Sequence, residues 1–143
     1  MNRAAKYTTG IVAAHLLANI VHGLAHRDLH VGLAPLGLIF VIAVVLISPL
    51  LAMGLVWTAQ ERLGLILLSL SMFGSLLFGL YQHFLAVSPD HVRLQPRSPW
   101  GITFVMTAYL LLITEAIGTY IGAHFLSVGR LSPANDLNRE GRK

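Results

Sequence analysis

Four long stretches of apolar residues, separated by short polar segments, dominate the sequence. No Asp, Glu, Lys or Arg occurs in 7–26, 31–60 or 63–89, and 98–129 contains only Glu115. About 20 helical residues cross a hydrocarbon layer about 30 Å thick, so each stretch is long enough to cross once and too short to cross twice. The pattern predicts helices near 8–28, 34–57, 63–87 and 100–128.

The predicted fold class is an all-α integral membrane protein, a four-helix bundle with up-down-up-down topology, because four spans are joined by short loops. Residues 1–128 form the single transmembrane domain in this interpretation. Residues 129–143 are polar and have no apolar periodicity, which predicts a disordered cytoplasmic tail. Pro49 lies inside the second predicted span, where it is expected to kink the helix.

Composition agrees with a membrane location. The chain is 55% apolar and 11% charged, against roughly 45–50% and 25% in an ordinary soluble domain. The net charge of +4 comes from Lys and Arg at the ends of apolar stretches, with no basic run interleaved with aromatic residues. Membrane topology therefore explains the basicity better than nucleic-acid binding does. We expect the lipid bilayer of the cell membrane as partner, with a homo-oligomer or a membrane-protein partner left open.

The orientation follows from the distribution of positive charge. Seven Lys and Arg residues lie in the N-terminus, the 58–62 loop and the C-terminal tail, whereas the other side holds three. The positive-inside rule then places both termini in the cytoplasm. A cleaved signal peptide is the alternative for the first span, but His15, Asn19 and His22 interrupt what should be a short apolar core.

Histidines line one face of the first span. Seven helical steps turn through about −20° and four steps through about +40°, so His15, His22, His26 and His30 fall within an arc of about 80°. Asn19 joins the same stripe. Such a face is costly to expose to lipid, which places it toward the interior of the bundle.

A metal site at the outer end of the bundle is the functional hypothesis. The i, i+4 spacing puts successive imidazoles one turn apart, close enough to share a metal ion. The opposing set would come from the end of the third span and the loop after it. Imidazole and carboxylate without thiolate favour zinc or copper, and haem b between two axial histidines is a second option. The candidate ligands are His22, His26, His30, His83, Asp90 and His91. The competing interpretation is that these side chains only border the lipid headgroups.

Glu115 is the only charged residue in the middle of a predicted span. An ionised, unpartnered carboxylate there costs roughly 2.5–3.5 kcal/mol on insertion scales. It should therefore face the interior, and His15 and Asn19 lie at a matching depth. We expect Glu115 to pair with one of them, either as a structural hydrogen bond or as a proton-carrying or ligand-binding group.

Other chemistry is constrained by what the sequence lacks. It contains no cysteine, which excludes disulfides, thiolate metal sites and thiol redox catalysis. No phosphate loop, nucleophile elbow or paired-carboxylate motif is visible, so enzymatic activity is not supported. Two further hypotheses remain. One is a non-catalytic membrane subunit or assembly partner whose polar residues bond between helices, and the other is proton-coupled transport by an oligomer.

Overall fold

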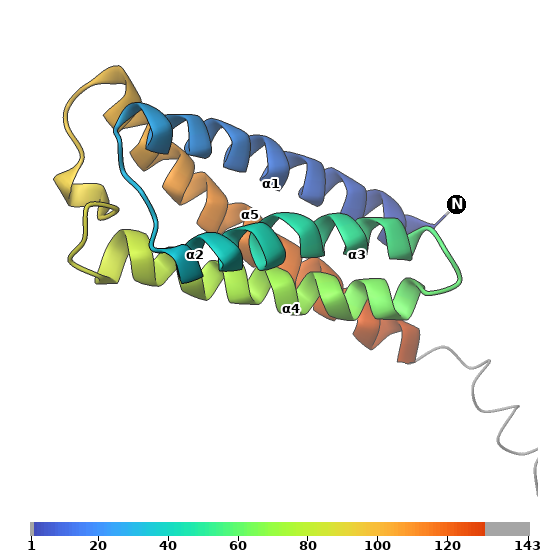
Figure 1. Ribbon diagram of the computed structural model, residues 1–143. Coiled ribbons are helices and arrows are strands. Elements are labelled where there is room, and N and C mark those ends of the chain that lie inside the picture. The colour runs from blue at the N-terminus through green and yellow to red at the C-terminus, as the bar shows by residue number, and fades with distance from the viewer. Residues whose placement is uncertain (1, 131–143) are drawn as a thin grey trace, which may run out of the picture.

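Four helical columns lie side by side in the computed structural model, which describes residues 2–130 (Figure 1). Successive columns run in opposite directions, and the described part of the chain contains no strand. The all-helical expectation is confirmed. The elements are α1 (Arg3–Asp28), α2 (Pro35–Phe40), the π-helix η1 (Val41–Ile47), α3 (Ser48–Val56), α4 (Glu61–Leu80), the π-helix η2 (Tyr81–Leu85), the short 3-10 helix η3 (Val92–Leu94) and α5 (Pro99–Arg130).

All four columns are long and apolar enough to cross a membrane. The first begins earlier than near residue 8, at Arg3, because the Asn2 side chain caps the helix by accepting a hydrogen bond from the Ala5 amide at 3.2 Å. The last continues through Arg130, so the first two residues of the predicted tail are helical. Residues 131–143, the rest of that tail, lie outside the described residues.

The second column is irregular where Pro49 predicts a kink. Pro49 has no amide hydrogen, so the carbonyl of Val45 lacks its α-helical donor. The chain adopts a π-helix just before the proline, and Ser48 Oγ donates to the Ala43 carbonyl at 2.7 Å. His15 of α1 then supplies a donor to the Val45 carbonyl, with Nε2 at 3.1 Å. The distortion is thus stabilised by a side chain of the neighbouring helix.

Small residues allow α4 and α5 to pack closely. A methyl group on Gly118 would lie 2.8 Å from Met72, and one on Gly122 would lie 2.8 Å from the Leu65 carbonyl. Both glycines are therefore required by the close approach, as expected for a GxxxG pair. The apolar core lies in this half of the bundle, toward the start of α1, and contains Ala4, Ala5, Val12, Ala52, Val56, Leu65, Leu68 and Met72.

The other half of the bundle is packed less densely. α1 packs along α5 and touches α3, but α1 and α2 make almost no contact. The two longer loops, 29–34 and 86–98, close this end (Figure 1). Asn19, His22 and His26 of the first column therefore lie beside an open space, whereas His15 is buried.

Candidate metal centre

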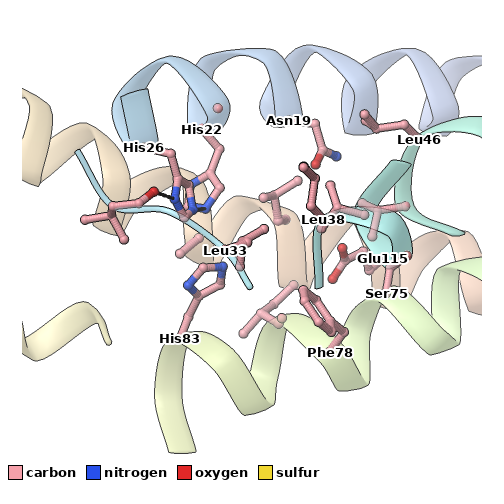
Figure 2. Close-up of a pocket in the computed structure, with 18 of the residues that line it drawn as sticks. Asn19, His22, His26, Leu33, Leu38, Leu46, Ser75, Phe78, His83 and Glu115 are labelled. Carbon is pink, nitrogen blue, oxygen red and sulfur yellow. Dashed lines mark hydrogen bonds between the residues drawn. The ribbon is translucent and has the colours of Figure 1, made fainter. Parts of the chain in front are cut away.

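Three histidines converge at the loop-bearing end of the bundle. His22 and His26 lie one turn apart on α1, and His83 points toward them from η2, at the end of the α4 column (Figure 2). One ring nitrogen from each of the three lies within 4.8 Å of the others. The Nε2 atoms of His22 and His26 are 3.1 Å apart. We call these three residues the histidine cluster.

Each ring of the cluster is held from behind through its Nδ1 atom. His26 Nδ1 lies 2.9 Å from the Val31 carbonyl and His83 Nδ1 lies 3.1 Å from the Asp90 carbonyl. Both partners come from the loops that close the bundle. His22 Nδ1 lies 2.8 Å from the Thr107 hydroxyl on α5. Two loops and one helix therefore fix the orientations of the three rings.

These partners determine where the protons sit. A backbone carbonyl only accepts, so Nδ1 of His26 and of His83 must carry the hydrogen. The Thr107 hydroxyl donates its own hydrogen to a backbone carbonyl, that of Thr103 at 2.7 Å or of Phe104 at 3.1 Å. When that hydrogen stays on a carbonyl, the hydroxyl accepts from His22 Nδ1, and all three neutral rings are Nδ1–H tautomers with a lone pair on Nε2. When the hydroxyl instead donates to His22 Nδ1, His22 carries its hydrogen on Nε2 and donates it to His26.

In the first of these two states, the lone pairs of His22 and His26 face each other across 3.1 Å. Two acceptors at this distance repel unless a proton or a cation lies between them. Tetrahedral zinc with Zn–N bonds of about 2.0–2.1 Å keeps its imidazole nitrogens about 3.3 Å apart. The first two rings are therefore spaced as metal ligands are, and His83 provides a third nitrogen on a different helix.

Asp90 adds negative charge beside the cluster. Its Oδ1 atom lies 3.6 Å from His26 Nδ1, and the residue is only 4% exposed. The same oxygen has no hydrogen-bond partner within residues 2–130. A buried carboxylate is costly without a balancing cation. Asp90 therefore lies behind the ligands, where it favours positive charge in the cluster through His26.

An aromatic ring excludes water from one side of the cluster. Phe104 is fully buried, and its ring centroid lies 4.6 Å from that of His22, 4.8 Å from that of His26 and 5.4 Å from that of His83. His22 and His83 are themselves 6% and 8% exposed. A metal ion there would be shielded from solvent on the Phe104 side.

Two further candidate ligands lie outside the cluster. α1 ends at Asp28, and His30 follows it with a φ of 53° and an exposed side chain, so the helical stripe does not extend to this residue. His91 Nδ1 instead accepts a hydrogen bond from the Arg93 amide at 3.1 Å and caps η3. His124, near the far end of α5, stacks on Tyr120.

The expected pairing of Glu115 is not formed. His15 lies 3.4 Å from the Thr114 hydroxyl and bonds to Val45, while the Asn19 side chain donates to the His15 carbonyl at 3.0 Å. Glu115 is 2% exposed, and its Oε2 atom has no hydrogen-bond partner in the described part of the chain. His15 instead bonds to the Val45 carbonyl, which lacks its α-helical donor because residue 49 is a proline.

Comparison with protein-family models, curated proteins and solved structures finds no match for the chain. The function is therefore argued from the chemistry of the site.

The cluster fits a bare metal ion and does not fit haem. A haem needs its flat macrocycle between two axial imidazoles. The rings of His22 and His83 have centroids 5.0 Å apart at an interplanar angle of 82°, so one ring meets the other edge to face. No macrocycle can lie between rings in this contact.

Proposed function

We propose that this chain is a membrane protein that binds one transition metal ion through Nε2 of His22, His26 and His83. The observation that carries the proposal is the convergence of one nitrogen from each of three rings within 4.8 Å, with two Nε2 atoms 3.1 Å apart and each Nδ1 atom hydrogen-bonded from behind. Metal-ligating histidines in general donate their second N–H to a carbonyl, carboxylate or hydroxyl in this way.

The donor set indicates the metal. Imidazole nitrogen suits zinc and copper, and hard cations such as magnesium and calcium prefer oxygen. Three protein ligands leave a fourth position open, an arrangement that zinc proteins use where a water molecule or a substrate must reach the metal. We therefore propose zinc or copper, with an open position facing the interior of the bundle.

Metal analysis of the purified protein tests this proposal. The wild type should carry close to one equivalent of zinc or copper, or take it up in a titration at neutral pH. Replacement of any cluster histidine by Asn keeps an amide donor near the position of Nδ1 and removes Nε2. We expect these variants to lose more than about 100-fold in affinity, because changes behind the ligands alone cost 10–100-fold.

Controls come from histidines outside the cluster. His30→Asn suits the left-handed backbone at that position, and His124→Asn lies at the far end of α5. Both should bind metal as the wild type does. Loss of metal in the controls, or its retention in all three cluster variants, would contradict the proposed ligand set. An absorption spectrum with a Soret band would show bound haem and contradict the proposal of a bare metal ion.

A non-catalytic membrane subunit is the second candidate. It is supported by the bonds of His15, which join α1 to η1 and lie near α5 without involving the cluster. A wild-type protein that neither contains metal nor takes up zinc or copper would favour this function.

We also propose that the four columns span the cell membrane with both termini and the 58–62 loop in the cytoplasm. The absence of native cysteine allows single cysteines to be labelled without background. In intact cells, an impermeant maleimide should label Leu94→Cys, a position that is 62% exposed in the loop near the cluster. It should not label Gln60→Cys until the membrane is opened. Labelling of Gln60→Cys but not of Leu94→Cys in intact cells would show the opposite orientation.

A further inference from the structure

A cavity of about 500 Å³ extends from the histidine cluster into the middle of the bundle. All three cluster histidines line one end of it, and Ser75 and Glu115 line the other (Figure 2). Glu115 lies eight residues beyond Thr107 on α5, which corresponds to about 12 Å at 1.5 Å per residue. The volume is in the range of sites for small organic ligands.

The walls between these two ends are mainly apolar. They are formed by side chains such as Leu33, Leu38, Val41, Phe78 and Leu111. A hydrated ion has no partners along such a surface, whereas the hydrocarbon part of a ligand is stabilised by it.

The cavity opens between α1 and α2. Gly23 and Leu38 line it and are both exposed, and the two helices make almost no contact. This opening lies on the side of the bundle, within columns that are long and apolar enough to cross a membrane. A ligand would therefore enter from the lipid rather than from water.

Glu115 is the group at the inner end of the cavity that can bond to a ligand. The residue is 2% exposed, and its Oε2 atom has no hydrogen-bond partner among residues 2–130. Gly79 brings α4 close, since a methyl group there would lie 3.7 Å from Oε2. A buried carboxyl group of this kind is stabilised by a hydrogen-bond donor that the ligand supplies.

We infer that the cavity binds a lipid-soluble molecule whose hydroxyl or amine group donates a hydrogen bond to Glu115. The apolar body of the ligand lies against the leucine and valine walls, and its far end reaches toward the histidine cluster. This inference concerns the cavity and Glu115 and does not require metal in the cluster, so metal analysis and ligand binding succeed or fail separately.

Photolabelling in lipid nanodiscs tests the inference. The probe is 1-decanol with a photoactivatable diazirine in the middle of its chain, and mass spectrometry locates the cross-links. We expect labelling of cavity residues such as Leu111, in excess over residues of α5 outside the cavity such as Ile113. Excess 1-decanol or decylamine should compete, and decane should not, because decane has no donor.

Two kinds of variant distinguish a specific site from general partition into lipid. Glu115→Leu should weaken probe binding about tenfold, the size expected for one buried hydrogen bond. Glu115→Gln should keep the binding of decanol within a few-fold, since the amide oxygen still accepts. Decylamine should compete less well in Glu115→Gln if its ammonium group pairs with a carboxylate.

Variants at the opening of the cavity test the inference independently, and α1 offers a matched control. A Cβ at Gly23 or at Gly10 meets nothing within 4 Å, and both lie on α1, but only Gly23 lines the cavity. Gly23→Leu should reduce labelling of the cavity several-fold, and Gly10→Leu should leave it unchanged. Equal labelling in these two variants, equal labelling of Leu111 and Ile113, or full competition by decane would overturn the inference.

Discussion

The Nε2 atoms of His22 and His26 lie 3.1 Å apart, and the Nδ1 atom of each ring is hydrogen-bonded elsewhere. When both rings carry their hydrogen on Nδ1, this contact places two lone pairs face to face and is repulsive without a shared proton or cation. The bundle holds the two rings in this contact through a hydroxyl group of α5 and a carbonyl group of the 29–34 loop. The geometry is therefore prepared for a positive charge.

Thr107 should matter for metal binding although it is not a ligand. Thr107→Val keeps the shape of the side chain and removes the hydroxyl that accepts from His22 Nδ1. We expect zinc affinity to fall about 10–100-fold, the usual effect of a partner behind a metal-bound histidine. Thr103→Val is the matched control, since the Thr103 hydroxyl bonds to the Pro99 carbonyl one turn earlier on α5. Equal affinities in the two variants, measured by competition with a chelator, would refute this role.

Asp90 should strengthen metal binding by its charge. Asp90→Asn retains the backbone carbonyl that accepts from His83 and removes the negative charge beside His26. We expect zinc to bind several-fold more weakly, because a buried charge interacts strongly with a cation a few ångströms away. Isothermal titration in detergent measures the change. Zinc affinity equal to or above that of the wild type would show that the carboxylate does not act on the site.

Acid should release the metal. Imidazole binds a metal ion only in its neutral form, and free imidazole takes up its proton near about pH 6.5. Protons then compete with the metal ion as the pH falls, so affinity should decline. Above neutral pH it should level off. A zinc affinity that does not vary between about pH 5 and 8 would be inconsistent with ligation by imidazole.

His15 should stabilise the bundle through Pro49. His15→Leu leaves the Val45 carbonyl without a donor, which costs about 1–3 kcal/mol. Pro49→Ala restores an amide hydrogen that can bond to that carbonyl in a regular helix. His15→Leu should therefore destabilise the Pro49→Ala background much less than the wild type. Thermal unfolding of the four proteins of this cycle measures the coupling, and purely additive effects would disprove it.

The helices were predictable from the sequence because charge and apolar runs divide the chain clearly. The residues at which the helices begin and end were harder to predict. The start at Arg3 depends on the Asn2 cap, and the irregularity before Pro49 takes the form of a π-helix whose Val45 carbonyl is bonded by His15 of the neighbouring helix.

The candidate site was predictable only in part. Helical spacing brings His22 and His26 together, and the matching depth of His83 on another helix points to the same place. Val31, Phe104 and Thr107 could not be found from spacing, because loop paths and helix rotation decide their contacts. The polar Thr107 in an apolar span was the one available signal. The helical spacing does not apply to His30, because the helix ends at Asp28.

X-ray absorption at the zinc edge tests the central claim most directly, because it reports the atoms bound to the metal. In the zinc-loaded wild type we predict nitrogen or oxygen neighbours at about 2.0–2.1 Å, with the outer-shell scattering of three imidazole rings. His83→Asn, loaded at high zinc, should show one imidazole fewer, and His30→Asn should match the wild type. A wild-type spectrum without imidazole scattering, or one that His83→Asn leaves unchanged, would contradict a metal centre built by His22, His26 and His83.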